Sequence, residues 1–322
     1  MTATANQSPV KFNVRVNQYR YSYEDLLRIW QEADRLGYYS ASLFDLLTVD
    51  ALECWTTLTA LLTQTERIRA VPMVLANQYR HPVLTAKMMA TLDVISGGRI
   101  TLGIGAGGSR RDTENSGMAF PSTRRRCEML EESLTIIRRL WTEPEVNFEG
   151  KHYRVSGASV SPKPKQRPTP PILVGGHGLR HVLPMIGRTA DICNAGSNDT
   201  AEQHREYARI IREAAESVGR DPTSIELTHN ANCVIAPTRR DYDGVVARLA
   251  EQAGMTAAQY QVNNLRNTLS GTPEQVAQRI AEYVDYGIRY FFVVFPDPAP
   301  SETLALFAQE VMRRFSPASL PG

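Results

Sequence analysis

The chain has few cysteines and no long apolar run. Its 322 residues include four cysteines, and no two of them have the C-x-x-C spacing of a redox or metal-binding pair. This pattern argues against a disulfide scaffold, predicts reduced thiols in a cytoplasmic protein and suggests no metal site. No apolar run reaches the roughly 18 residues that a membrane-spanning helix requires. We therefore expect neither a membrane protein nor a small disulfide-stabilised one.

The chain also lacks a charge excess of either sign. Lys and Arg number 36 and Asp and Glu 34, which gives a formal net charge of +2. Such a balance does not predict binding to nucleic acid or to an anionic membrane surface. The first residues show no basic segment followed by an apolar one, so no secretory signal is expected. With 42% hydrophobic and 22% charged residues, the composition is typical of a globular enzyme with a sizeable core.

Glycine, in contrast, is concentrated at the ends of two apolar segments. SGGRITLGIGAGG (96–108) and PPILVGGHG (170–178) each run from a short apolar stretch into several glycines. Glycine at the carboxyl end of a buried strand lets the main chain approach a ligand where a Cβ would collide. Two such strand ends predict a large planar or phosphorylated ligand lying across one face of a sheet or barrel.

Strand and helix patterns alternate along the chain. The expected strands are Lys11–Val16, Tyr39–Phe44, Ile68–Leu75, Ile100–Ile104, Ile172–Val174, Ala190–Ala195, Ile225–Ala236 and Tyr290–Phe295. Helices are expected between most of them, for example from the Ser22 cap to Gly37, over Pro82–Ile95 and over Arg124–Trp141. Eight strands interleaved with helices favour an α/β fold of the closed (β/α)8 type, a TIM barrel with insertion segments.

An open, doubly wound sheet is the alternative, with GIGAGG taken as a dinucleotide-binding motif. That motif would have to follow the first strand, and here it follows the fourth. We therefore predict a single barrel domain over residues 10–316, a flexible tail at 1–9 and a second tail at 317–322. The segments 142–171 and 243–270 are expected to shape the pocket, because loops commonly carry specificity.

Five separated segments resemble the bacterial luciferase-like superfamily of barrels, over roughly residues 10–315. They are His81–Gly108, Arg126–Trp141, the expected hairpin VNFEGKHYRV (146–155), Pro162–Gly178 and Gly271–Ile280. The resemblance implies binding of a flavin or deazaflavin. Within the superfamily, the chain looks more similar to the branch that uses the deazaflavin coenzyme F420 than to the FMN-dependent monooxygenases.

The resemblance also implies positions for the cofactor. Asp45 matches the acidic position beside the ring, and the third-strand end matches a bulge that often holds a non-proline cis peptide. Gly175 to Gly178 match a phosphate-binding turn. The cofactor-binding residues implied are Asp45, Met73, Val74, Leu75, Asn77, Gly105, Ala106, Gly107, Gly175, Gly176, His177, Gly178, Gly196 and Ser197.

Candidate catalytic residues are Asp45, Asn77 and His229. His229 is included because polar side chains that point inward from a barrel strand usually face the site. Asp45 has a second interpretation, as a loop cap. Many relatives carry a histidine after the acidic position, where this chain has Leu46, which cannot relay a proton.

Leu46, Arg110 and Glu114 are candidates for the substrate pocket. Arg110 and Glu114 are equally compatible with a solvated charged loop. The basic run 124–126 stands at a helix N-terminus, the unfavourable end for cations. An anionic partner or an internal carboxylate such as Glu132 would offset that charge.

Three functions remain open. The first is hydride transfer between coenzyme F420 and a small organic substrate. The second is FMN-dependent monooxygenation, which usually needs a separate reductase to supply reduced flavin. The third, suggested by Leu46, is a cofactor-binding protein with weak catalysis. The resemblance further implies a homodimer, and the sequence does not identify the substrate.

Overall fold

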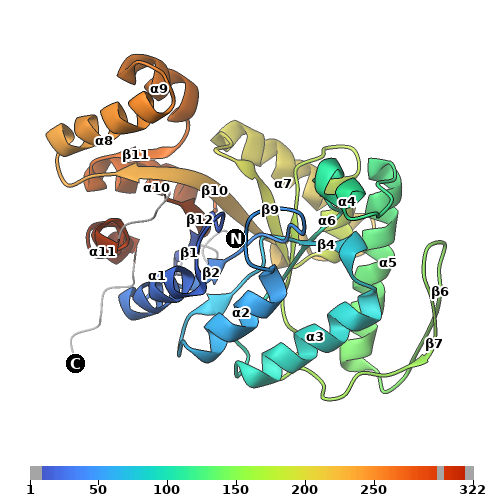
Figure 1. The fold of residues 1–322 in the computed structure, drawn as a ribbon. Coiled ribbons are helices and arrows are strands. Elements are labelled where there is room, and N and C mark those ends of the chain that lie inside the picture. Colours follow the sequence, from blue (N-terminus) through green and yellow to red (C-terminus); the bar gives the residue numbers. More distant parts are fainter. Residues whose placement is uncertain (1–8, 296–300, 316–322) are drawn as a thin grey trace, which may run out of the picture.

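A computed structural model describes residues 9–295 and 301–315 of the chain (Figure 1). Apart from Pro9, both expected tails, 1–9 and 317–322, lie outside the described residues. The main sheet contains nine strands on one path. They are β1 (Lys11–Arg15), β2 (Ser40–Ser42), β3 (Arg69–Ala70), β4 (Leu75–Ala76), β5 (Leu102–Gly105), β8 (Ile172–Gly175), β9 (Ile192–Ser197), β10 (Glu226–Ile235) and β12 (Tyr290–Val294).

The sheet closes into a barrel. Its strands pair in parallel in the order β3-β2-β1-β12-β10-β9-β8-β5-β4. The two ends of this path are β3 and β4. Both come from the region of the expected strand Ile68–Leu75, and four residues separate them in the chain. A parallel bridge between Ala70 and Ile100 completes the closure, and the Thr101 N–H donates to the Ala70 carbonyl oxygen at 3.0 Å. The predicted (β/α)8 architecture is confirmed, with its third strand interrupted.

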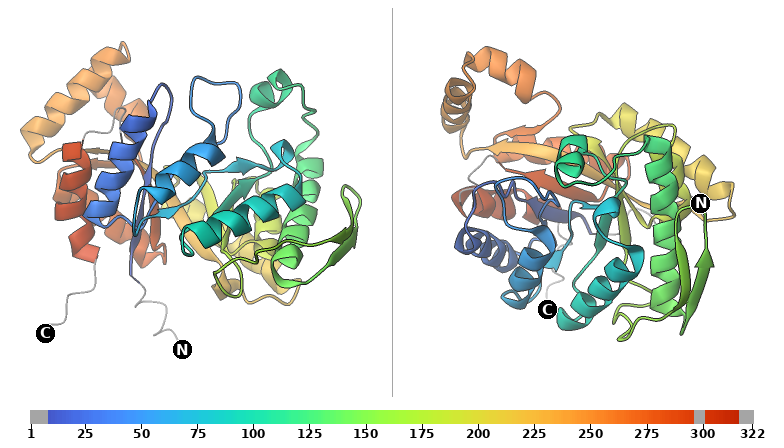
Figure 2. Two further views of the ribbon diagram at one scale, coloured as in Figure 1. Left: turned by 60° about the horizontal axis from the view of Figure 1, so that its bottom comes forward. Right: turned by 45° about the vertical axis from the view of Figure 1, so that its right-hand side comes forward.

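Helices surround this barrel, as Figures 1 and 2 show. They are α1 (Tyr23–Leu36), α2 (Cys54–Thr63), α3 (Pro82–Ile95), α5 (Thr123–Thr142), α6 (Val182–Thr189), α7 (Ala201–Glu216), α10 (Pro273–Asp285) and α11 (Ser301–Glu310). Local signals set several of their ends. Ser22 and Asp25 form a capping box at the start of α1, and Gly37 ends it at φ +83°. Pro82 opens α3 after the His81 cap.

Other elements were not expected from the sequence. α4 (Arg110–Asn115) occupies what the sequence suggested was a loop, and α8 (Arg239–Gln252) and α9 (Ala257–Asn264) project from the barrel in Figure 1. The short strand β11 (Leu269–Gly271) pairs with the far end of β10. α9 buries none of its residues, so it carries little of the apolar periodicity that marks a helix. The expected hairpin is present as β6 (Val146–Glu149) and β7 (Arg154–Ala158).

The barrel interior is filled in part by one small apolar cluster. Its members come from the segment between β3 and β4, from the paired strands β8 and β9, and from β12, which pairs with neither β8 nor β9, so the cluster spans the barrel: Val71, Met73, Leu173, Ile192, Tyr290 and Phe292. Polar side chains share this interior. The Asn13 amide donates to Ser40 Oγ at 2.6 Å, and Asn230 donates to Asn194 at 2.7 Å. These pairs satisfy groups that would otherwise be buried without partners.

Candidate active site

A cavity of about 490 Å³ opens at the carboxyl ends of β2, β4, β5 and β8. This is the end of a (β/α)8 barrel at which active sites lie. Both glycine motifs contribute to it. Its lining comprises Phe44, Asp45, Leu46, Met73, Val74, Leu75, Ala76, Tyr79, Gly105, Ala106, Gly107, Gly108, Ser109, Thr123, Arg126, Gly175, Gly176, His177, Gly178 and Val182. Most of the residues assigned to the cofactor from the sequence therefore line this one cavity.

The interruption of the third strand explains several of these glycines. The Met73–Val74 peptide is cis, as the resemblance implied, and the bulge packs against β5 and β8. A Cβ on Gly103 would overlap the Pro72 carbonyl oxygen, and one on Gly105 would lie 2.8 Å from Val74 Cγ2. The sequence interpretation gave ligand approach as the reason for glycine at these positions. The structure adds that Gly103 and Gly105 make room for the bulge.

Gly108 differs from its neighbours. An added Cβ there would have nothing within 4 Å, although the residue lines the cavity. No packing of the protein itself therefore excludes a side chain at this position, and the open space belongs to the cavity.

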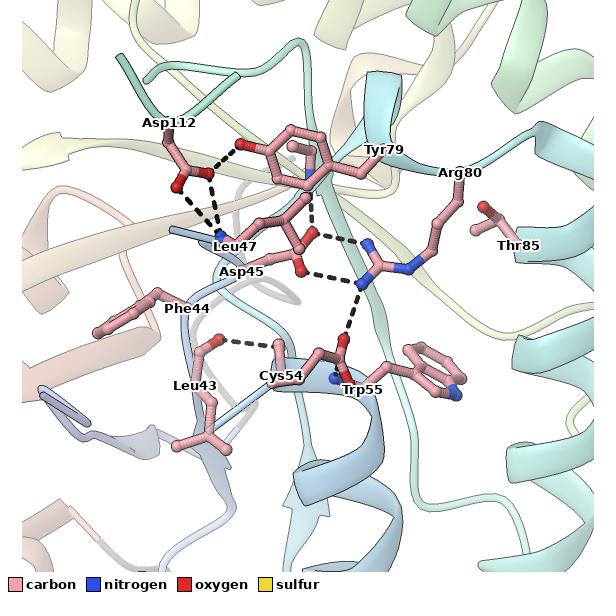
Figure 3. Close-up of polar contacts among 12 residues, drawn as sticks. Leu43, Phe44, Asp45, Leu47, Cys54, Trp55, Tyr79, Arg80, Thr85 and Asp112 are labelled. Carbon is pink, nitrogen blue, oxygen red and sulfur yellow. Dashed lines mark hydrogen bonds and ion pairs between the residues drawn. The ribbon is translucent and has the colours of Figure 1, made fainter. Parts of the chain in front are cut away.

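Asp45 is held in an ion pair on the cavity wall (Figure 3). Arg80 Nη1 donates to Asp45 Oδ2 at 2.7 Å and Nη2 donates to Oδ1 at 3.0 Å. The Ala76 amide also donates to Oδ2, at 3.0 Å. Only 1% of the Asp45 side chain is exposed. Since both oxygens are engaged, this geometry favours a role for Asp45 in positioning β4 rather than in accepting a proton.

A second carboxylate fixes the loop that carries Leu46. Asp112, on α4, accepts hydrogen bonds from the amides of Leu47 and Thr48 and from the Tyr79 hydroxyl. Burial and the bond to Asp112 raise the pKa of Tyr79 to about 12, so this cavity residue stays neutral. Burial favours protonation of Asp112, but these hydrogen bonds outweigh it and lower the pKa of the carboxyl. The sequence reasoning missed Asp112; the S-x-x-D cap from Ser109 was the available signal.

His229 does not line the cavity, which corrects the sequence-based placement. In the sheet register, His229 is paired with Phe291, whereas Asn230 is paired with Phe292, which lies inside the barrel. His229 therefore points outward. Its ring stacks on Tyr283 of α10 with ring centres 4.0 Å apart, and its Nδ1 lies 3.0 Å from His204 Nε2 on α7. A buried position behind the barrel leaves it no contact with a ligand in this cavity.

The remaining candidates divide between the rim and a neighbouring pocket. Arg110 and Glu114 pair with each other on the surface at 2.7 Å and are not part of the cavity lining. Gly196 and Ser197 end β9 and are also outside the lining; a Cβ on Gly196 would meet the Asp199 carboxylate. Asn77 lies in a second pocket that adjoins the cavity. The segments 142–171 and 243–270 line neither space, contrary to expectation.

The lining suits a planar ring that carries an anionic group. Leu46, Met73 and Val74 offer apolar surface. At the β8 turn, no described residue accepts a hydrogen bond from the His177 or Gly178 amide, whereas the Gly176 amide donates to Asn194. Two free amides on a turn before a helix are a common arrangement for binding an anion. The described residues contain no cluster of three metal-ligating side chains, and no described helix is long and apolar enough to cross a membrane.

Comparison with known proteins places the chain in a family. The model of the luciferase-like monooxygenase family matches residues 7–267. The chain belongs to that family. An F420-dependent glucose-6-phosphate dehydrogenase of Microbacterium testaceum is 26% identical over 333 aligned residues, which cover 95% of this chain and 97% of the relative. The superfamily resemblance drawn from the five segments is thus confirmed.

Other luciferase-like proteins use a flavin. An FMNH2-dependent dimethylsulfone monooxygenase of Pseudomonas putida is 27% identical over 215 residues, which cover 67% of this chain and 58% of that relative. Among solved structures, the coenzyme F420-dependent tetrahydromethanopterin reductase of Methanopyrus kandleri matches with a TM-score of 0.79. It is 20% identical, and the match covers 96% of this chain and all of that one, which supports the shared fold.

Proposed function

We propose that this luciferase-like protein is an oxidoreductase that transfers a hydride between coenzyme F420 and a small organic substrate. The observation that carries the proposal is the single cavity where Gly105 to Gly108 and Gly175 to Gly178 meet. The relative that covers nearly the full length of the chain is named as F420-dependent, which supports the choice of cofactor.

The residues of the cavity have distinct roles in this proposal. The free amides of His177 and Gly178 bind the cofactor phosphate. The apolar side chains of Leu46 and Val74 exclude water from the ring, which favours hydride transfer over side reactions. When bound, the deazaflavin supplies a carbon centre that accepts or donates a hydride. The protein contributes position and a dry environment rather than a covalent intermediate.

FMN-dependent monooxygenation is the second candidate, because one relative is named as FMNH2-dependent. The same cavity would then hold reduced flavin supplied by a separate reductase. Titration of the purified protein with oxidised F420 and with FMN, followed by ligand fluorescence, separates the two. Tighter binding of F420 supports the proposal, and binding of FMN alone overturns it in favour of the monooxygenase.

A weakly catalytic cofactor-binding protein is the third candidate, and Leu46 is the reason for it. We expect the Leu46→His variant, assayed with reduced F420 and a broad substrate panel, to turn over no faster than the parent protein. A gain of orders of magnitude would show that the natural site is impaired.

Three further expectations belong with this function: a homodimer, a single barrel domain and a cytoplasmic location. They follow from the resemblance and from the cysteine content. Sedimentation of the purified protein at several concentrations tests the dimer. Limited proteolysis, which should release no stable fragment smaller than the barrel, tests the single domain.

A further inference from the structure

We propose that the pocket beside the cofactor cavity binds the acidic group of the substrate, so that the substrate is a small organic anion with a short apolar body. This inference rests on the function proposed above, because it places the substrate next to the hydride-transfer site. It assigns a role to the start of α5, which the sequence analysis marked only as a basic run.

The pocket is small and shares a wall with the larger cavity. Its volume is about 180 Å³, and Ala106 and Arg126 line both spaces. A group bound here therefore lies directly beside the cofactor cavity. The full lining is Asn77, Gln78, Ala106, Ala119, Pro121, Arg125, Arg126 and Met129. Four of these are apolar, which suits a compact hydrocarbon body.

The pocket carries positive charge that no described carboxylate balances. Arg125 is exposed, and its guanidinium makes no ion pair or hydrogen bond to any described residue. Arg126 donates to the carbonyl oxygens of Ala106 and Pro121, both neutral, and lies over the Phe120 ring at 3.9 Å. Burial, and to a lesser degree the charge of Arg110, lower the pKa of Arg126, as expected for a cation without an anionic partner.

Neighbouring arginines outside the pocket, in contrast, have carboxylate partners. Arg124, one residue earlier on α5, pairs with Glu128 at 2.9 Å, and Arg110 pairs with Glu114 at 2.7 Å. Glu132, which the sequence suggested as a partner for this run, instead accepts the amides of residues 151–153 in the hairpin turn. Each guanidinium nitrogen of Arg126 already donates to an oxygen of the protein, so Arg125 is the pocket arginine whose guanidinium is left for an external anion. A guanidinium presents paired donors that match a carboxylate or phosphate.

A polar side chain with little exposure also lines the pocket and has a free acceptor. Asn77 is 5% exposed, and its amide nitrogen donates to the Tyr153 hydroxyl at 3.3 Å. No described group donates to Asn77 Oδ1. An amide oxygen that lines a pocket and accepts no hydrogen bond from the described residues suits a hydroxyl on the substrate. The geometry therefore favours a small acid with a hydroxyl group over a purely apolar substrate.

The cofactor itself is the other source of an anion, since F420 carries an acidic tail. The test uses matched probes without cofactor: a panel of small fluorinated aliphatic and aromatic carboxylates, each paired with its neutral amide. Fluorine NMR titration gives the affinity ratio of acid to amide. We expect at least one acid to bind about tenfold more tightly than its amide. This ratio is about what one charge-assisted hydrogen bond contributes to affinity.

Three variants locate the effect. Arg125→Met should reduce the ratio to about one, by the same reasoning. Arg124→Met, the matched control on the same helix turn, should leave it unchanged. Ala119→Trp adds bulk at an exposed position of the lining and should block acid and amide alike, without changing the charge.

The outcomes are distinct. The inference is overturned if no acid exceeds its amide, or if Arg124→Met and Arg125→Met act equally. It is also overturned if Arg125→Met weakens binding of F420 but leaves the acid-to-amide ratio unchanged, since the cation would then serve the cofactor tail. A protein that binds no F420 but keeps the Arg125-dependent ratio would contradict the proposed function and retain the anion pocket.

Discussion

Arg80 and Asp45 form a bidentate ion pair in which the side chains are 12% and 1% exposed. Replacing Arg80 leaves the Asp45 carboxylate buried with the Ala76 amide as its one remaining described donor. We expect Arg80→Met to lower the free energy of unfolding by about 3 kcal/mol, measured by urea denaturation. The double variant Asp45→Asn/Arg80→Met should recover part of the loss because it removes both charges.

The surface pair of Arg110 and Glu114 provides the control for this prediction. These side chains are 63% and 50% exposed, so Arg110→Met should change stability by no more than about 0.5 kcal/mol. Equal effects of Arg80→Met and Arg110→Met would show that the buried pair has no special role in holding β2 and β4 together.

Gly105 and Val74 make a steric prediction. A Cβ at Gly105 would lie 2.8 Å from Val74 Cγ2, closer than carbon atoms approach without displacement. Gly105→Ala should therefore destabilise the protein by about 1–3 kcal/mol. Truncation of Val74 removes the opposing methyl groups. The double variant Gly105→Ala/Val74→Ala should therefore lose less stability than the sum of the losses in the two single variants. Additive losses in thermal denaturation would argue against this contact.

Gly108 makes the opposite prediction for the same wall. Its added Cβ meets nothing within 4 Å, so Gly108→Ala should leave the melting temperature unchanged. The methyl group occupies cavity space, so the affinity for F420 should fall severalfold in a fluorescence titration. Gly244→Ala, at an equally open position on α8 away from the cavity, should not alter F420 binding. Unchanged affinity in Gly108→Ala would place the ring elsewhere.

The buried histidine pair behind the barrel predicts a pH dependence of stability. Burial lowers the pKa of His204 to about 4, and burial with the charges of His204 and Arg279 lowers that of His229 to about 3, against an ordinary value of 6.5. Between pH 6.5 and about 4 the unfolded chain binds more protons than the folded one, so the free energy of unfolding falls as the pH is lowered.

Urea denaturation at pH 7, 5.5 and 4.5 measures this dependence. The double variant His204→Leu/His229→Phe removes both groups and should show a shallower decline than the parent protein. Identical slopes in the two proteins would assign the acid sensitivity to carboxylates elsewhere. The cavity should be unaffected at pH 7, because neither histidine lines it.

The order of elements was predictable because the signals for it are local. The Ser22 cap, the Gly37 stop and the proline at the start of α3 act within one turn of chain, and short apolar segments marked the eight expected strands. The short α4 and the solvent-exposed α9 have little periodicity, so they were missed. Asp112 went unnoticed for the same reason, since it lies on a six-residue helix.

The direction of the His229 side chain shows where prediction from local sequence signals fails. A strand alternates its side chains, but the absolute direction depends on its neighbours, and the pairing of β10 with β9 shifts register between Thr228 and Asn230. Polar character alone suggested an inward side chain. The cluster with His204 and Tyr283 could not be anticipated, because its partners stand on α7 and α10, 25 and 54 positions away in the chain.

The sequence by itself determined the barrel, its glycine-lined face and the family of redox proteins to which the chain belongs, because local periodicity and glycine placement specify them. Only the tertiary structure decided which side chains are available for chemistry. In the folded protein, both oxygens of Asp45 accept hydrogen bonds from Arg80, and His229 points away from the cavity. The Arg125 guanidinium has no carboxylate partner among the described residues. Such pairings depend on closure of the barrel, which brings residues distant in the chain within hydrogen-bonding reach.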